Sequence, residues 1–445
     1  MTSAPLPGPG HPQDSVYHDD VVRICRDLIR IDTSNHGGNV SRGEPEAAEY
    51  CAALMRDAGM EPQVFESAPG RASVVGRVTG WDRRAPALVL HGHLDVVPAE
   101  ASEWSVDPFA AELRDGMIWG RGAVDMKGMD AMILTVLGEL HRSGRRPRRD
   151  LVVAFFADEE AGGVYGARWL VDHHPELFAG ATEAVSEVGG FSTDIRGQRA
   201  YLLQTAEKGL SWLNLTASGA PGHGSGVHPD NAVTRLSGAV HRIGQHEWPL
   251  QYTKTTRALL EQVAEICGVE FDETDPTAQL DALGTAARFV GSTLRNSSNP
   301  TGLTAGYKHN VIPGRAQATL DVRFLPGQEE EVMDVLRELA GDGVDFDHEH
   351  RDISLEVPFS GGLVDLMVQC IQAEDPGAPV LPFMMSGGTD NKSLSRLGID
   401  GYGFAPLQLP ADLDFTGLFH GIDERVPVQS LVFGCRVLSR MLEPR

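Results

Sequence analysis

Short apolar runs alternate with helix-like segments along the first half of this 445-residue chain, and this order limits the folds it can adopt. The apolar runs lie at 72–78, 87–90, 151–156 and 200–203. Apolar side chains with helical spacing lie at 17–31, 45–58 and 129–140. Strands that alternate with helices are typical of an α/β core. The sequence therefore predicts such a core, with a mostly parallel central sheet.

From about Glu207 the pattern changes. Strand-like alternation appears at 210–219 and 316–326, a helix is expected near Asn231, and the stretch "RNSSNPTG" (295–302) reads as a loop. A strand–helix–strand–helix unit of this size is typical of a small α+β domain. The predicted organisation is a flexible tail at 1–14, a core domain of 15–206 and 353–445, and an inserted α+β domain at 207–352.

Composition excludes several classes of function. Lys+Arg total 38 against 62 for Asp+Glu, a net charge of −24, whereas a general nucleic-acid binder needs a basic surface. No apolar run approaches the length of a membrane span, and the N-terminus lacks the apolar region of a signal peptide. The five cysteines are scattered without a CxxC pair, which is typical of reduced thiols in the cytoplasm. We therefore expect a cytoplasmic protein that binds neither nucleic acid nor membranes.

The apolar run at 87–90 continues into "HGHLDVVP" (91–98), which places three titratable residues at the end of a predicted buried strand. His93 and Asp95 are two residues apart in an extended segment, so their side chains point to the same side. His93 is a candidate metal ligand through one ring nitrogen, with Asp95 holding the other. Taken alone, the motif fits a structural polar contact equally well. His91 is interpreted as a supporting or packing residue.

Acidic residues follow other predicted strands. Asp125 lies in the glycine-rich "WGRGAVDMKG" (119–128), where a helix N-cap is the simpler explanation of an isolated aspartate. Glu159 and Glu160 directly follow the run at 151–156, and adjacent carboxylates are costly to bury unless a cation compensates them. Of such a pair, one can bind metal while the other acts as a general base towards water.

Two further residues complete the candidate set. Glu187 in "SEVGG" follows a short apolar stretch, and His420 in "HGIDERV" precedes the last predicted helix. With the residues above, the chain offers two histidines and three carboxylates as ligands, beside Asp95 and Glu159. This is the set of side chains expected of a two-metal hydrolase site with one bridging carboxylate.

Five ordered motifs give the chain a resemblance to a known family, the di-zinc amidohydrolases that include acetylornithine deacetylase, succinyl-diaminopimelate desuccinylase, aminoacylase-1 and carboxypeptidase G. The motifs are "HGHLDVVP", "WGRGAVDMKG", "ADEEAGG", "SEVGG" and "HGIDERV". Smaller matches are "EKG" (207–209), "GAPGHGS" (219–225), "NVIPGRAQATLDVRFLPG" (310–327) and "SGGTD" (386–390). The resemblance implies a zinc-exopeptidase-like core whose inserted domain is a lid or dimerisation domain.

The resemblance also implies a role for each site residue. One metal takes His93 and Glu187, the other takes Glu160 and His420, and Asp125 bridges the two. Asp95 orients His93, and Glu159 is the general base. The family's bridging aspartate often precedes a cis peptide bond, so we expect one between Asp125 and Met126.

The remaining implied roles concern the substrate. His223 stabilises the oxyanion, in dimeric relatives from the partner subunit, and Asn310 and Arg323 hold a substrate carboxylate. Backbone N–H groups of Ser386, Gly387, Gly388 and Thr389 are available to the same substrate. His348 and His350 in "DFDHEHRD" (345–352) have ligand-like spacing, but an exposed strand explains them better.

These observations together predict a metal-dependent amidohydrolase. It would cleave an amide or peptide bond next to a free carboxylate, in a dipeptide, a C-terminal residue or an N-acyl amino acid. A biosynthetic N-acyl amino acid deacetylase or desuccinylase is the alternative, and a non-catalytic binding homologue is disfavoured because no candidate ligand is missing. Two divalent metals are expected, zinc foremost, with cobalt or manganese open because carboxylate-rich sites accept several ions. A homodimer formed through the inserted domain is also open.

Overall fold

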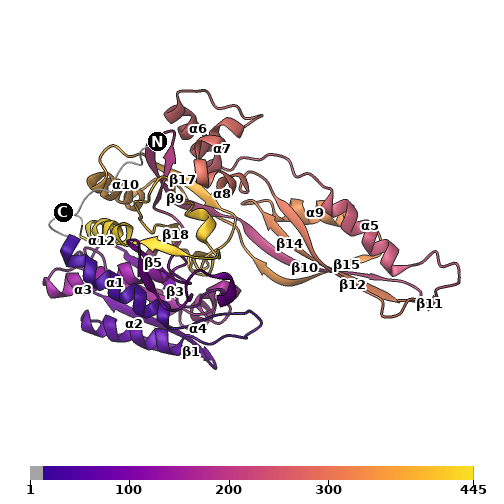
Figure 1. Cartoon of the computed structure of the whole chain (residues 1–445), viewed down its shortest axis with the longest axis horizontal. Helices are drawn as coiled ribbons and strands as arrows, with labels where there is room; N and C mark the ends of the chain where they lie inside the picture. Colours follow the sequence, from indigo (N-terminus) through magenta and orange to yellow (C-terminus); the bar gives the residue numbers. More distant parts are fainter. Residues whose placement is uncertain (1–13, 444–445) are drawn as a thin grey trace.

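The structure is a computed structural model that describes residues 14–443. Figure 1 shows a body from which a long arm extends. The sequence assigns 1–14 to a flexible tail; residues 1–13 lie outside the described residues, and Asp14 begins the first helix. No helix in the described part of the chain is long and apolar enough to cross a membrane.

A ten-stranded sheet forms the centre of the body, in the order β1-β2-β6-β3-β7-β18-β9-β16, with β8 and β17 also paired to β9. The strands are β1 (Gln63–Ala68), β2 (Arg71–Val78), β3 (Ala87–His93), β6 (Leu151–Phe156), β7 (Ala181–Ser186), β8 (Phe191–Ile195), β9 (Gln198–Glu207), β16 (Leu355–Glu356), β17 (Val380–Met385) and β18 (Asp400–Gly403). The central strands β6, β3, β7 and β18 are parallel to one another. The pairs β1–β2, β2–β6 and β8–β9 are antiparallel, so the sheet is mixed. The predicted parallel arrangement holds for the centre, while the short β1–β2 and β8–β9 connections require antiparallel pairing.

Both faces of this sheet are buried. Along β3, Leu88 and Leu90 belong to one hydrophobic cluster and Val89 to another, as the two-residue period of a strand requires. Helices that share the first cluster include α1 (Asp14–Arg30), α2 (Pro45–Asp57), α3 (Lys127–Arg142), α10 (Gly362–Glu374) and α12 (Val428–Leu442). The opposite face is covered by α4 (Ala167–His173) and α11 (Asn391–Ser395). Residues on both strand faces are therefore apolar, which explains the continuous apolar runs in the sequence.

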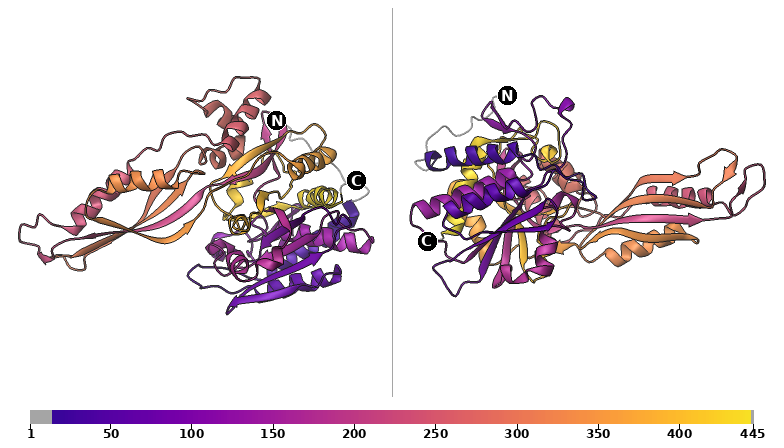
Figure 2. Two further views of the ribbon diagram at one scale, coloured as in Figure 1. Left: turned by 180° about the vertical axis from the view of Figure 1, so that it is seen from behind. Right: turned by 90° about the horizontal axis from the view of Figure 1, so that it is seen from below.

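The arm contains a four-stranded antiparallel sheet in the order β12-β14-β10-β15. Its elements are β10 (Gly209–Ser218), β12 (Ser297–Ala305), β14 (Arg315–Phe324), β15 (Val344–Asp352), α5 (Ala232–Gly244) and α9 (Glu329–Ala340). Alternate residues of β14, such as Leu320 and Val322, pack with Leu236 of α5 and Leu336 of α9 in a hydrophobic cluster of their own. Figure 2 shows both helices on one face of this sheet. The small pair β11 (Gly222–His223) and β13 (Val311–Ile312) lies at the far end of the arm (Figure 1).

The stretch "RNSSNPTG" was expected to be a loop, but most of it belongs to strand β12. Pro300 has no N–H to donate, so it could not pair on both sides as a central strand requires. However, β12 is an edge strand, and its register shifts between Pro300 and Gly302. Edge strands and bulges are the positions in a sheet that tolerate proline. Loop-like composition was therefore misleading here.

The helices between α5 and β12 pack on the body. They are α6 (Lys254–Cys267), α7 (Thr277–Ala282) and α8 (Ala287–Gly291). Leu259, Leu283 and Val290 belong to the same hydrophobic cluster as the core helices, and α6 and α8 both contact β17. This helical segment, which is defined as residues 254–291, therefore lies beside the large sheet (Figure 1).

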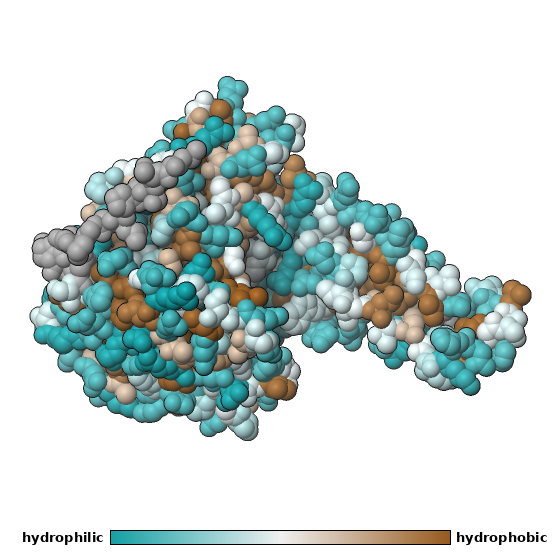
Figure 3. Space-filling model, viewed as in Figure 1, coloured by the Kyte–Doolittle hydropathy of each residue, from teal (hydrophilic) through white to brown (hydrophobic). Residues whose placement is uncertain are grey.

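The remaining elements are short. A three-stranded sheet joins β4 (Glu112–Arg114), β5 (Met117–Trp119) and β19 (Arg425–Pro427). Single 3₁₀ turns are η1 (Ala101–Glu103), η2 (Glu159–Ala161), η3 (Pro175–Phe178), η4 (Gly284–Ala286) and η5 (Thr416–Leu418). Hydrophilic side chains cover most of the face in Figure 3, as expected of a chain with a net charge of −24.

Candidate metal centre

The parallel centre of the sheet brings three predicted ligands to one edge. His93 is the last residue of β3, Glu160 lies in η2 just after β6, and Glu187 directly follows β7. Because β3 pairs in parallel with β6 and β7, the carboxyl ends of these strands meet at the same edge. Asp158 lies in the left-handed region at φ 67°, which turns the chain from β6 into η2.

Asp125 lies between the two predicted histidine ligands. Its Oδ1 is 3.0 Å from Nε2 of His93, and its Oδ2 is 3.3 Å from Nε2 of His420. The peptide bond between Asp125 and Met126 is cis, as predicted. The alternative role as helix cap is wrong, because the N-cap of α3 is Met126 and no side-chain cap hydrogen bond forms there. One carboxylate with an oxygen towards each histidine has the arrangement of a bridging ligand.

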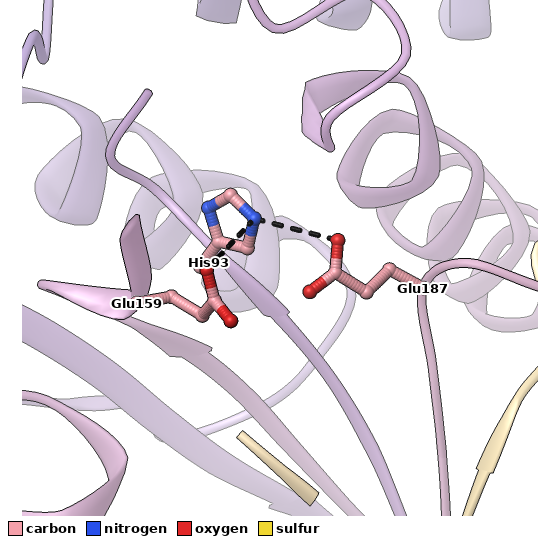
Figure 4. Close-up of side chains that lie close together, drawn as sticks. All are labelled: His93, Glu159 and Glu187. Atoms are coloured by element: carbon pink, nitrogen blue, oxygen red, sulfur yellow. Dashed lines mark ion pairs between the residues drawn. The ribbon is translucent and has the colours of Figure 1, made fainter. Parts of the chain in front are cut away.

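The other two predicted carboxylate ligands each lie near a different histidine. Glu187 Oε2 is 3.5 Å from His93 Nε2, while Glu160 Oε2 is 3.0 Å from His420 Nε2. Glu159 Oε2 lies 3.9 Å from His93 Nε2. Figure 4 shows Glu159 and Glu187 pointing towards the His93 ring from different elements. The sequence-predicted ligands are therefore gathered into one cluster, with Glu159 beside them.

This cluster fits divalent cations. Burial raises the pKa of Glu187, Glu159 and Glu160, because a carboxylate loses hydration and faces other carboxylates there. Glu160 Oε1 is buried with no hydrogen-bond partner among the described residues. Carboxylate oxygens and imidazole nitrogens are ligands of zinc and related ions. Cations would supply both the missing partner and the missing positive charge.

Asp95 contacts His93 mainly through its backbone. The Nδ1 atom of His93 is 2.9 Å from the carbonyl oxygen of Asp95 and 3.6 Å from its carboxylate. The carboxylate instead accepts hydrogen bonds from the backbone N–H groups of Glu159 and Glu160, at 3.0 and 3.2 Å. It also accepts one from the side chain of Asn35 at 2.8 Å. Asp95 thus connects the His93 strand to the η2 turn.

Glu424 is a positioning residue that the sequence motifs did not reveal. It is buried, and its two oxygens accept hydrogen bonds from the backbone N–H groups of Gly122, Val124 and Asp125, at 3.1, 2.7 and 3.1 Å. Arg121 donates a fourth at 2.6 Å. Glu424 therefore fixes the backbone that carries the bridging aspartate. Its place in "HGIDERV", four residues after His420, was the available signal.

A cavity of about 380 Å³ opens beside the ligands. The predicted substrate residues that line it are Arg323, Ser386, Gly387, Gly388 and Thr389. Arg323 is also held by Asp321, through contacts of 2.7 and 3.0 Å. Glu207 is buried and accepts hydrogen bonds from the N–H and hydroxyl of Thr389, at 2.9 and 2.6 Å, which fixes the 386–389 loop.

His223 and Asn310 do not join this group. His223 lies in β11 at the tip of the arm, where its ring is exposed and contacts Ser225 at 2.8 Å. Asn310 is adjacent, and its carbonyl accepts a hydrogen bond from Gly224. Figure 1 shows β11 far from β3. Within one chain, the structure therefore separates these two residues from the cluster.

Three other histidines that the sequence analysis named lie outside the candidate ligand set. His91 is buried and hydrogen-bonded to Asn391 at 2.9 Å, which makes it a supporting residue. His348 and His350 lie on strand β15, in agreement with the strand interpretation. His348 contacts Ser211, while His350 also lines the cavity, a placement that its spacing did not predict.

Comparison with known proteins shows the family to which the chain belongs. One sequence relative is aminoacylase-1 of Homo sapiens, which is 28% identical over 436 residues that cover 95% of this chain and 94% of the relative. Another is N-fatty-acyl-amino acid synthase/hydrolase PM20D1 of Xenopus tropicalis, which is 29% identical over 400 residues that cover 83% of this chain and 76% of the relative. The fold matches an M20 family metallo-carboxypeptidase from Sulfolobus solfataricus with a TM-score of 0.73, at 17% identity, over 95% of this chain and 98% of that one. Residues 89–444 match the sequence profile of peptidase family M20/M25/M40, and the chain therefore belongs to this family.

Proposed function

We propose that the protein hydrolyses an amide or peptide bond next to a free carboxylate, in a dipeptide, a C-terminal residue or an N-acyl amino acid. The observation that carries the proposal is Asp125, whose two oxygens face His93 and His420. This arrangement supports a site for two divalent cations, zinc foremost. Bound there, such ions would polarise the scissile carbonyl and make water a better acid.

Glu159 is proposed as the general base. It lies beside the cluster, 3.9 Å from His93, and is not needed to complete either half of the ligand set. Its carboxylate would take a proton from the attacking water as the water oxygen bonds to the carbonyl carbon. The same proton then passes to the amine nitrogen as the C–N bond breaks.

Arg323 is proposed to hold the substrate carboxylate. A guanidinium matches a carboxylate in shape as well as in charge. Arg323 and the Ser386–Thr389 loop line the same cavity as Glu159, so a short substrate can reach both. This favours substrates with a free carboxylate close to the scissile bond. The names of the two sequence relatives, an aminoacylase and an N-fatty-acyl-amino acid hydrolase, favour N-acyl amino acids among them.

A homodimer and a cytoplasmic location are part of the proposal. The exposure of His223 at the arm tip favours a site that is completed by the arm of a second chain. Large apolar side chains are exposed on the same arm, namely Val227, Leu303 and Tyr307. Exposed apolar side chains of this kind favour contact with another protein surface. The cytoplasmic location rests on the scattered cysteines of the sequence.

The test is a hydrolysis panel of dipeptides and N-acyl amino acids, run before and after removal of metal by a chelator. We expect turnover that is lost on chelation and restored by zinc, cobalt or manganese. Glu159→Gln should retain bound metal but lose about 10²–10⁴-fold in kcat, the usual contribution of general base catalysis. Glu103→Gln, at an exposed turn, is the matched control and should behave like wild type. Unchanged turnover by Glu159→Gln would rule out this mechanism.

A further inference from the structure

Two aromatic side chains line the cavity next to a predicted ligand. Phe289 on α8 and Phe419, which directly precedes His420, have ring centroids 6.3 Å apart and planes inclined by 18°. Both rings are half-buried. The ring centroid of Phe383 is 5.8 Å from that of Phe289. Phe415 contacts Phe419 edge-on, with ring centroids 5.4 Å apart. The pair is thus the half-buried edge of an aromatic cluster that continues into the core.

The helical segment 254–291 holds Phe289 in place. Val290 and Leu283 are buried in the main hydrophobic cluster, so this part of the segment is anchored on the body. Polar contacts add to this: the Thr416 hydroxyl donates to the carbonyl of Thr285 at 3.1 Å, and Lys208 Nζ donates to that of Ser292 at 2.8 Å. The aromatic wall is therefore preformed, as is usual for ligand pockets.

We propose that Phe289 and Phe419 form an apolar subsite that receives a bulky apolar group of the substrate, aromatic or long alkyl. This rests on the proposed amide hydrolysis and names the substrate class. Val188 and Met385 also line the cavity and extend its apolar surface. Binding of such a group is favoured in proportion to the apolar area that it removes from water. It reaches the subsite either as the acyl chain or as the amino acid side chain, since both flank the scissile bond.

The test compares kcat/KM for matched substrates in wild type and Phe289→Ala. The N-acyl series is N-acetylglycine, N-hexanoylglycine and N-acetylphenylalanine, and the dipeptide series is Gly-Gly, Phe-Gly and Gly-Phe. We expect wild type to prefer a bulky substrate, and Phe289→Ala to reduce that preference at least about tenfold. The series member that loses its advantage shows which side of the amide bond occupies the subsite. Phe289→Leu should keep an intermediate preference.

Phe271→Ala is the matched control. Phe271 lies between α6 and α7, packs against Tyr252 and is absent from the cavity wall. It should leave the preference unchanged, and thermal unfolding checks that each variant is folded. The subsite is refuted if wild type turns over the panel without a preference for bulky groups. It is also refuted if Phe289→Ala lowers kcat/KM equally for small and bulky substrates. Failure of wild type to cleave any substrate would instead refute the amide hydrolysis itself, and the subsite with it.

Discussion

At the scale of single residues, Glu424 shows how a group outside the ligand set can control it. Its four hydrogen bonds hold Arg121 and the backbone up to Asp125. In Glu424→Gln, the amide NH₂ cannot accept from the donors that it faces, so buried donors lose their partners. We expect metal affinity to fall about 10–100-fold, the usual effect of changing a partner behind a ligand.

Competition with a coloured chelator measures this affinity. The control is Glu112→Gln, an exposed carboxylate in the same small sheet as β19. It should bind metal as wild type does. Equal affinities of Glu424→Gln and wild type would show that the Asp125 backbone holds its position without this carboxylate.

His91 makes a prediction about pH. Burial lowers its pKa to about 4, from an ordinary value of 6.5, because the charged ring would lose its hydration. Above pH 6.5 the ring is neutral in both the folded and the unfolded chain, so it costs no stability. As pH falls from 6.5 to about 4, the unfolded chain takes up a proton that the folded chain does not, and the free energy of unfolding decreases. The total decrease in the free energy of unfolding is about 3 kcal/mol, at 1.36 kcal/mol for each pKa unit.

Urea unfolding of the chelated proteins between pH 7 and pH 4 measures this loss. Over that range the stability of wild type should fall about 3 kcal/mol further than that of His91→Gln, which carries no titrating group there. His141→Gln, at an exposed histidine of α3, is the control and should follow wild type. Parallel curves for wild type and His91→Gln would contradict the assignment.

Much of the site could be predicted at the residue scale because its members follow strands. The positions of His93, Glu160 and Glu187 after apolar runs implied a common sheet edge, and the structure brings them together. Glu424 was missed because it follows no strand and acts on backbone N–H groups, which no side-chain pattern reveals. The grouping of Asn310 with Arg323 is not found within one chain, because Asn310 lies beside β11 at the arm tip while Arg323 lines the cavity, and sequence spacing does not reveal this separation.

At the scale of elements, the loop after β7 depends on a close backbone approach. A Cβ atom at Gly189 would lie 1.9 Å from the carbonyl oxygen of Gly403 in β18 and 2.8 Å from the backbone nitrogen of Gln204 in β9. Neither strand can move without disturbing the sheet. Gly189→Ala should therefore displace the loop that carries Glu187, lower the free energy of unfolding by about 1–3 kcal/mol and weaken metal binding.

Gly138→Ala is the matched control. Gly138 lies within α3, where the new Cβ would meet only the flexible end of Arg142, at 3.2 Å. Alanine is the better helix former, so this variant should gain up to about 1 kcal/mol. Chemical denaturation and metal titration of both variants are the measurements. A Gly189→Ala protein that binds metal normally would show that the Glu187 loop can adapt.

Element types were easier to predict than their partners. Apolar periodicity gave α1, α2 and α3, and strand-like alternation gave β10 and β14, because burial of one face sets these patterns. The strand β12 was missed because an edge position permits the proline and glycine that otherwise mark loops. Amphipathic helices such as α6 show which face is buried but not against which sheet, so the packing of the helical segment on the body was not predicted.

At the scale of the whole molecule, the arm places one predicted site residue far from the others. The candidate metal centre lies in the body, whereas His223 is exposed at the far tip of the arm (Figures 1 and 2). The arm has its own hydrophobic cluster, so its sheet and helices can form a stiff extension. A stiff arm suits the delivery of a side chain to a second molecule better than folding back onto its own body.

Mixed dimers test this arrangement. If His223 serves the partner's site, Glu159→Gln and His223→Ala are each inactive alone but complement one another, because one site of every mixed dimer has Glu159 from one chain and His223 from the other. Random mixing of equal amounts makes half of the dimers mixed, so activity should return to about a quarter of wild type. Refolding or co-expression of the two variants, followed by a turnover assay, measures the recovery. The control variant is His309→Ala, at another exposed histidine near the arm tip, which should be active on its own. A monomeric wild type in light scattering, or no recovery on mixing, would place any role of His223 within its own chain.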